Sequence, residues 1–383
     1  MLVDTQEQAD LRAAVRTLAR SYGHEYYLEA SRSGRKMDEL WHDLGKYGFL
    51  GVHLPVEYGG GGAGITELAI VCEELAAAGT PSLLIIVSAA ICSELIGRYG
   101  TAEQKSAWVP RLAAGEAKMA FSITEPDAGL NTLAMTTTAV RDGDDYVVNG
   151  RKYYASGVDE ADAVVVVVRT GADEHTGRAR LSLLLVDPDA PGLERQQIPT
   201  EVVSTEKQFS LFFDNVRVPA DRLLGTEGEG LTQVFNGLNP ERILAAALEN
   251  GIATYALDKA SRYAVERKVW GVPIGQHQGI AHPLAKAKIE VELARLMTSQ
   301  AAALHDAGLD AGAAANMAKY AAAEAALGAL DQAMQTHGGN GLATEYGLAT
   351  LWGITRLQRT APVSREMIFN YVAQRMLSLP RSY

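Results

Sequence analysis

Short stretches rich in glycine, arginine or carboxylates are the parts of this chain that could bind phosphate or move protons. The stretch THGGNGL (336–342) has the glycine content of a dinucleotide-binding loop, but it follows a helical pattern rather than a strand. A Rossmann loop needs its glycines directly after a strand, so 336–342 alone indicates a helix end and a tight turn. An arginine fork suits phosphate oxygens, and Arg267 could supply one. Taken alone, Arg267 is more simply a solvated charge on a helix.

Other signatures of catalytic or metal sites are absent from the sequence. It contains no GxSxG nucleophile turn, no GKS or GKT phosphate loop and no HExxH pair. His277 and His282 have the wrong spacing for two ligands on one helical face. Cys72 and Cys92 are the only cysteines, and they do not form a CxxC pair. We therefore expect no metal site and no disulfide framework.

The composition is that of a globular protein long enough for two or three domains, with 383 residues, 47% hydrophobic and 21% charged. A net charge of −11 argues against nucleic acid or an anionic membrane surface as a partner, although a local basic pocket for a phosphorylated ligand stays open. The N-terminus lacks the apolar run of a signal peptide. The most apolar stretch, 81–92, is too short to span a bilayer and indicates a buried helix. The expected location is cytoplasmic.

Hydrophobic periodicity divides the chain into three zones. Residues 1–118 and 226–383 have helical periods, including long patterns over 237–268 and 310–339. Residues 119–225 instead show β-branched runs such as 161–170, with hairpin turns predicted at the dipeptides 142–143 and 149–150. No helical period interrupts these runs, so we expect an antiparallel β domain. The predicted fold is α+β multidomain, with a helical domain (1–118), a β domain (119–225) and a C-terminal helical domain (226–383).

The stretches AFSITEPDAGLN (120–131), NGRKYYASG (149–157), ERKVWGVPIGQHQG (266–279) and QTHGGNGLATEY (335–346) resemble, in order and spacing, those of the acyl-CoA dehydrogenase family. The family patterns they match are TEPxAGSD, NGxKxWITN, RxxFGxxIxxxQ and QxxGGNGxxxEY. The resemblance covers essentially the whole chain. It implies an FAD enzyme that introduces an α,β double bond into an acyl-CoA thioester. It also implies a barrel-like middle domain and a C-terminal four-helix bundle.

The resemblance further implies which residues contact FAD. The contacts at and near the isoalloxazine ring would come from the β domain and from the motif before the last helix: Phe121, Ile123, Thr124, Gly129, Tyr154, Ser156, Ser364 and Glu366. The pyrophosphate and adenosine would be held from a neighbouring subunit by Arg267, Trp270, Gln278, Gln335, Gly338, Gly339 and Gly341. Because one site would draw on two subunits, the resemblance implies a homo-oligomer, a dimer of dimers forming a homotetramer.

The same resemblance locates the catalytic base. Most of the family carries a glutamate in YEGTSEIQ, where this chain has APVSREM with Pro362 at the glutamate position. The isovaleryl-CoA and long-chain members carry it instead before an arginine on an earlier helix, which is matched here by Glu241 and Arg242. Glu241 is therefore the expected base, Arg242 a substrate-binding residue and Glu366 a weaker candidate base. Without the resemblance, Pro-Glu-Arg would be ordinary capping at a helix start.

Two departures from the family pattern keep other functions open. Pro362 has no N–H, so the backbone donor that the family gives the thioester oxygen is missing. Leu130 stands where the family has a serine that contacts flavin and CoA. The resemblance therefore implies that Leu130 contacts the substrate. The alternatives are a non-catalytic or site-completing subunit of a heteromer, as in steroid side-chain breakdown, or a flavin oxidase. For the dehydrogenase, the expected partner is an electron-transfer flavoprotein in lipid metabolism.

Overall fold

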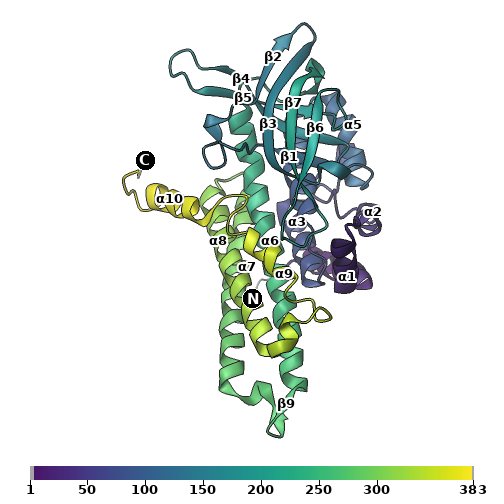
Figure 1. Ribbon diagram of the computed structural model, residues 1–383, viewed down its shortest axis with the longest axis vertical. Helices are drawn as coiled ribbons and strands as arrows, with labels where there is room; N and C mark the ends of the chain where they lie inside the picture. The colour runs from purple at the N-terminus through teal and green to yellow at the C-terminus, as the bar shows by residue number, and fades with distance from the viewer. Residues whose placement is uncertain (1–3, 382–383) are drawn as a thin grey trace.

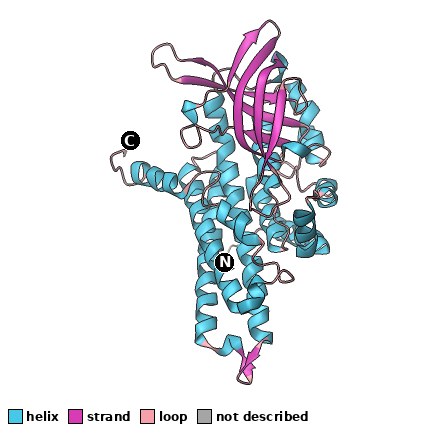
Figure 2. Ribbon diagram, viewed as in Figure 1, coloured by secondary structure: helices cyan, strands magenta, loops and turns pink. Residues whose placement is uncertain are grey.

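The computed structural model describes residues 4–381, and its elements fall into a helical block, a sheet and a second helical block (Figures 1 and 2). The first block packs its helices around a core of leucine, isoleucine and tryptophan side chains. Its helices are α1 (Gln6–Ser33), α2 (Asp38–Lys46), α3 (Ile65–Ala77), η2 (Ile85–Cys92), α4 (Ser93–Tyr99) and α5 (Ala102–Ala113). The predicted buried helix over 81–92 is confirmed, and its second half, η2, has the wider π-helical turn.

The middle block is a single eight-stranded sheet. Its strands are β1 (Met119–Ser122), β2 (Thr138–Asp142), β3 (Asp145–Ser156), β4 (Ala163–Ala172), β5 (Ala179–Val186), β6 (Leu193–Ile198), β7 (Gln208–Pro219) and β8 (Leu223–Leu224). They run in the order β6-β7-β3-β2-β4-β5-β8, and β1 pairs with β4. The sheet is mostly antiparallel as predicted, but β1 lies parallel to β4, so the sheet is mixed.

The two predicted hairpin turns had different outcomes. The turn at 142–143 is confirmed, since it joins β2 to β3. The turn at 149–150 is wrong, because both residues lie inside β3. Gly150 has φ +142°, and a Cβ there would come within 2.6 Å of Thr137. Gly150 therefore allows the irregular pairing of β3 with β7 and the close approach of its backbone to Thr137. It does not reverse the chain.

The last block consists of long helices packed side by side (Figure 1). Its elements are α6 (Gly230–Glu266), β9 (Lys268–Val269), β10 (Val272–Pro273), α7 (Gln278–Asp306), α8 (Gly312–His337), η7 (Gly338–Leu342), α9 (Leu351–Leu357) and α10 (Arg365–Arg375). Alanines on the facing sides of α6 and α8 let these helices approach closely. The β9–β10 hairpin joins α6 to α7 at the far end of the molecule from the sheet.

The alternative interpretation of Pro-Glu-Arg as a cap at a helix start is wrong. The helix α6 already begins at Gly230, which leaves Pro240 inside it without an N–H to donate. The last helix, α10, begins at Arg365, and the Ser364 hydroxyl caps it by accepting the Met367 N–H at 3.3 Å.

Among residues 4–381, no helix combines the length and the apolar content needed to cross a bilayer.

Candidate active site

Glu241 lies in the interior of α6 with a part-buried side chain. Burial raises the pKa of Glu241 to about 7, against the lowering effect of the positive charges of Arg242 and Lys319. The Glu241 charge also adds to the effect of burial in raising the pKa of the Cys92 thiol, which places the carboxylate close to η2. A carboxylate with a pKa near the working pH is suited to general base catalysis.

Lys319 on α8 is a residue of this cluster that the sequence did not single out. Its side chain is buried, and its Nζ donates to the carbonyl of Val363 at 2.6 Å. Burial lowers the pKa of Lys319 to about 8, while the charges of Glu249 and Glu241 oppose that shift. Lys319 therefore joins α8 to the loop before α10, in which Pro362 lies. Its only signal in the sequence was a charged residue within an alanine-rich helix.

Glu249 is a second residue that the sequence did not reveal. It lies on α6, wholly buried, and within residues 4–381 neither of its carboxylate oxygens has a hydrogen-bond partner. Burial raises the pKa of Glu249 well above its ordinary value, against the opposing charge of Lys319. Burial therefore disfavours the ionised form of Glu249, and Lys319 is the cation that opposes this effect.

Of the other residues predicted for the reaction site, Arg242 lies next to Glu241, whereas Glu366 and Leu130 are exposed. Arg242 is part-buried beside Glu241 and donates from Nη1 to Asn239 Oδ1 at 3.1 Å. Glu366 is exposed and ion-paired with Arg365 at 2.8 Å, and this partner lowers its pKa. An exposed carboxylate with a lowered pKa is a poor base, which favours Glu241 over Glu366. Leu130 is exposed in the turn after β1.

The β-domain residues predicted to contact the isoalloxazine ring lie near the end of β1, whereas Ser364 and Glu366 lie at the start of α10. Thr124 accepts the Tyr153 N–H through its carbonyl at 2.8 Å, so the segment of Phe121, Ile123 and Thr124 runs beside the end of β3. Tyr154 is about half exposed, with φ +57°. The end of β1 and the half-exposed Tyr154 ring lie at the surface beside the sheet. Gly129 is exposed in the neighbouring turn, and Ser156 donates to Gln208 at 2.9 Å.

A buried ion pair holds that strand end in place. Lys152 has no exposed surface, and its Nζ donates to Glu125 Oε1 at 2.9 Å and to the Ile123 carbonyl at 3.0 Å. Burial alone would raise the pKa of Glu125. The N–H groups of Thr136 and Thr137, together with Lys152, overcome that effect and lower it to about 2. The pair fixes the exit of β1 against β3.

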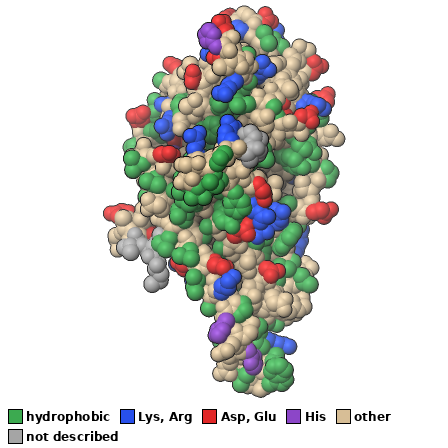
Figure 3. Space-filling view, turned by 90° about the vertical axis from the view of Figure 1, so that its left-hand side faces the viewer, with side chains coloured by type: hydrophobic (Ala, Val, Ile, Leu, Met, Phe, Trp, Pro, Cys, Tyr) green, Lys and Arg blue, Asp and Glu red, His purple; other side chains and the backbone are tan. Residues whose placement is uncertain are grey.

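The second predicted group, for pyrophosphate and adenosine, lies at the opposite end of α6 (Figure 1). Arg267 follows the last residue of α6, Trp270 is 88% exposed in the β9–β10 hairpin, and Gln278 begins α7. The turn of η7, with Gly338, Gly339 and Gly341, lies at the same end, because Asn340 donates to Tyr263 of α6 at 3.2 Å. Gln335 is exposed on the preceding turn of α8. The tip of the molecule stands free in Figure 3.

The sheet and the predicted pyrophosphate group lie at opposite ends of α6. Glu229, just before the helix, bridges Leu181 of β5, and the 37 residues of α6 at about 1.5 Å each separate that end from Arg267 by roughly 55 Å. Arg267 is exposed and has no ion pair within residues 4–381, and Gly338 has φ +60° with open space around it. An unpaired guanidinium beside an open glycine turn fits phosphate. The residues present therefore fit FAD if its two ends are held by different copies of the chain.

Comparisons with known proteins match all three blocks. Family models for the acyl-CoA dehydrogenase N-terminal, middle and C-terminal domains match residues 5–116, 120–216 and 228–377. The acyl-CoA dehydrogenase FadE12 of Mycobacterium tuberculosis is 54% identical over 383 residues, covering 100% of this chain and 98% of that protein.

Solved structures give the same result. A glutaryl-coenzyme A dehydrogenase in complex with glutaryl-CoA has a TM-score of 0.94 at 31% identity, covering 100% of this chain and 98% of that one. A glutaryl-CoA dehydrogenase from Mycobacterium smegmatis in complex with FADH2 has a TM-score of 0.91 at 27% identity, covering 99% and 97%. These matches confirm the predicted fold and support FAD as the cofactor.

The buried ion pair yields a prediction about stability. Lys152→Met leaves the Glu125 carboxylate buried without its cation, so the free energy of unfolding should fall by about 3–5 kcal/mol in urea titrations at neutral pH. Arg217→Met is the control, because Arg217 forms exposed ion pairs with Asp142 and Asp145 and should change stability little. An equal fall in the free energy of unfolding in the two variants would contradict the stabilising role of the Lys152–Glu125 pair.

Proposed function

The chain belongs to the acyl-CoA dehydrogenase family, and we propose that Glu241 is the base that removes the α-proton of its acyl-CoA substrate. The protein is an FAD-dependent oxidoreductase. The observation that supports Glu241 most strongly is a part-buried carboxylate with a pKa of about 7, in a chain that has proline at the usual base position. A second carboxylate, Glu366, is exposed and already paired.

When bound, FAD supplies the acceptor for the hydride that leaves the β-carbon. The protein residues deliver the rest of the chemistry. Glu241 takes the α-proton on its carboxylate, and burial of that group in the apolar surroundings of η2 strengthens it as a base. Arg242 lies beside it and orients the carboxylate through charge, while its Nη1 stays fixed to Asn239.

The thioester oxygen needs a donor that Pro362 cannot supply. Val363 is the next residue of the loop, and its N–H makes no hydrogen bond within residues 4–381. Its carbonyl is held by Lys319 at 2.6 Å, which fixes the loop on α8. We assign the backbone N–H of Val363 to the thioester oxygen, in place of the missing donor.

Completion of the flavin site requires a second copy of the chain. The separation of the two groups along α6 supports a homo-oligomer in which Arg267 and the η7 turn of one copy meet the β1 end of another. A dimer of dimers would satisfy this. An electron-transfer flavoprotein is the partner that we propose for reoxidation. Pro362 and Leu130 are the departures that would suit a site-completing subunit, and the candidate base Glu241 favours the enzyme over that alternative.

The first test is an anaerobic titration of FAD-loaded protein with acyl-CoA thioesters, followed by loss of flavin absorbance. The wild type should bleach. Glu241→Gln should bleach at least about 100-fold more slowly, because a positioned base typically contributes about 10²–10⁴-fold. Glu366→Gln is the matched control and should behave as the wild type. Equal bleaching by Glu241→Gln and the wild type would remove Glu241 from this role.

The pKa of Glu241 predicts the pH dependence of the reaction. The carboxylate form is the active one, and its pKa is raised to about 7, so kcat/KM should rise as the pH increases through about 7 and level off above it. Below that pH the protonated carboxyl cannot accept the α-proton. A kcat/KM profile whose acid limb lies near the ordinary glutamate value of about 4.3 would contradict this assignment.

Because the proposed flavin site is divided between two copies of the chain, a substitution far from Glu241 should change the affinity for FAD. Arg267→Ala removes a charge-assisted phosphate contact worth about 1.5–3 kcal/mol, so the Kd for FAD should rise by about 10- to 100-fold when apoprotein is titrated with FAD. The control is Arg262→Ala, an exposed arginine of α6 whose side chain, within residues 4–381, hydrogen-bonds only to the Asp258 carbonyl of its own helix. The same FAD affinity in both variants would exclude the tip of α6 from the site.

A further inference from the structure

His24 of α1 is a buried histidine that takes no part in the proposed reaction, and both nitrogens of its ring face backbone carbonyl oxygens. Nδ1 lies 2.8 Å from the carbonyl oxygen of Gly79, and Nε2 lies 3.3 Å from that of Gly347. A carbonyl oxygen can only accept a hydrogen bond, whereas a neutral imidazole has a single N–H to donate. The neutral ring therefore satisfies one of the two oxygens, and the imidazolium satisfies both.

Two glycines in the left-handed conformation make room for this ring. Gly79 has φ +89° and Gly347 has φ +69°. A Cβ at Gly79 would come within 2.7 Å of His24 Cβ, and one at Gly347 within 2.6 Å of His24 Nε2. The rings of Tyr27 and Tyr255 pack against the imidazole, with centroids 5.8 and 4.9 Å away. A side chain at either glycine would displace the imidazole, so both glycines are needed for it to lie between the two carbonyls.

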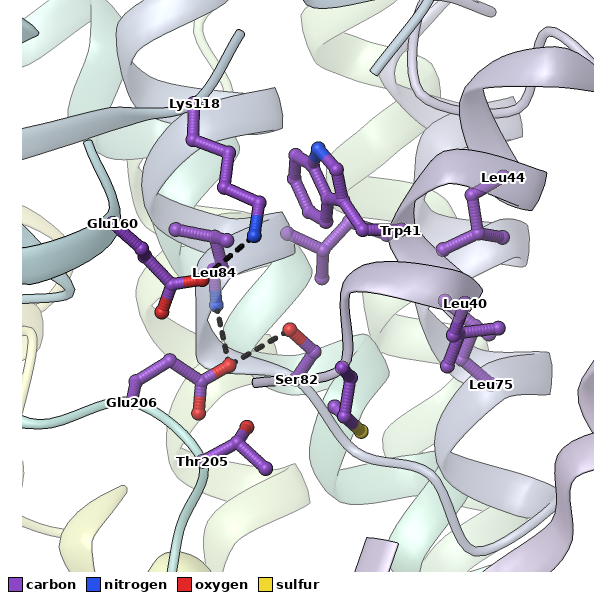
Figure 4. A pocket seen from close by; sticks show the side chains of 12 residues that line it. Leu40, Trp41, Leu44, Leu75, Ser82, Leu84, Lys118, Glu160, Thr205 and Glu206 are labelled. Atoms are coloured by element: carbon purple, nitrogen blue, oxygen red, sulfur yellow. Dashed lines mark hydrogen bonds and ion pairs between the residues drawn. The ribbon is translucent and has the colours of Figure 1, made fainter. Parts of the chain in front are cut away.

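The Gly79 side of this arrangement is firmly held. Gly79 lies in the turn that joins α3 to η2, and Glu206 braces the end of that turn. Glu206 accepts the Ser82 hydroxyl at 2.8 Å and the backbone N–H of Leu84 at 3.1 Å, as the dashed lines in Figure 4 show. The hollow beside these bonds has a volume of about 20 Å³, room for about one water molecule. The turn is therefore closely packed, and the Gly79 carbonyl is a fixed acceptor for His24.

The Gly347 side leads to the turn that is proposed to hold the adenylate end of FAD. Gly347 lies in the loop between η7 and α9. Asn340 of η7 donates to the Tyr346 hydroxyl at 3.1 Å, and Lys259 of α6 donates to the Tyr346 carbonyl at 2.6 Å. Because Gly347 is the next residue, a hydrogen bond from His24 to its carbonyl fixes the loop directly beside the residue that contacts η7.

The surroundings of His24 keep its ring neutral at neutral pH. Burial lowers the pKa of His24 below its ordinary value of 6.5, the two glycine carbonyls oppose that shift, and the positive charges of Lys259 and Arg32 add to it. Glu25 of α1 acts on Lys259 and Tyr255, and burial raises the pKa of Tyr255 to about 12, so its hydroxyl carries no charge. The imidazole therefore gains its second proton as the pH falls below 6.5.

We propose that His24 is a pH-sensitive positioning residue, which when protonated donates to both glycine carbonyls, fixes the loop after η7 and so strengthens the binding of FAD. The inference rests on the proposed flavin site. It goes beyond that site by naming a residue that does not contact the flavin and yet couples flavin retention to pH. Because the protonated ring is the one that fixes the loop, the gain in FAD affinity appears as the pH falls and is absent at neutral pH.

The test is a titration of apoprotein with FAD between about pH 7.5 and about pH 5, the range in which histidines titrate. Relative to His24→Gln, the Kd of the wild type for FAD should fall by about tenfold toward the acid end, as expected for one added hydrogen bond from a charged donor. The two proteins should bind FAD equally at the neutral end. His53→Gln is the matched control, because His53 is a part-buried histidine of the same block whose Nε2 faces the Ser93 hydroxyl. A hydroxyl can donate as well as accept, so this variant should follow the wild type.

Hydrogen exchange in the loop 343–350 of the full-length protein gives a readout that does not depend on flavin. After correction for the intrinsic exchange rate, protection of this loop should increase as the pH falls in the wild type and not in His24→Gln. If that variant does not fold, the wild-type profile decides alone. Protection that does not change with pH, or FAD affinities of the wild type and His24→Gln that follow pH in parallel, would overturn the proposal. An unchanged FAD affinity in Arg267→Ala would instead reject the flavin site itself, so the two failures can be told apart.

Discussion

The unbroken course of α6 constrains where every other part of the site can be. The helix begins against the sheet, passes η2 at Glu241 and ends at the β9–β10 hairpin, so it sets the distance between the candidate base and the predicted pyrophosphate group. A rigid helix of this length holds its two ends apart, and the conformation of the connecting loops does not change that distance. In the proposed site, FAD would be held between copies of the chain, and the proposed chemistry of Glu241 would then depend on assembly.

Buried charge is the second constraint. Lys319 on α8 lies within reach of the charges of both Glu241 and Glu249 on α6, and burial disfavours the ionised form of each of the three. The charges of Arg242 and Lys319 limit the rise in the pKa of Glu241. Lys319 also donates to the Val363 carbonyl, so the same ammonium acts on the candidate base and holds the loop that contains Pro362.

The sequence allowed the order of helices and strands to be predicted because the hydrophobic period changes where the fold changes, as in the β-branched run of β4. It misassigned 149–150, since a glycine in a bulge and a glycine in a turn have the same local signature. Glu241 was predictable only through the resemblance to a family. Glu249, Lys319 and the setting of His24 between two glycine carbonyls were not, because each depends on which groups meet across separate segments, and no pattern along one helix records that.

The central claim is that Glu241 abstracts the α-proton, and proton exchange tests it most directly. Tert-butylacetyl-CoA has α-hydrogens but no β-hydrogen to lose as hydride, so incubation of the FAD-loaded enzyme in D2O isolates the proton step. The account predicts that mass spectrometry will find deuterium at the α-carbon with the wild type and almost none with Glu241→Gln. Exchange at the same rate in both proteins would show that another group removes the proton.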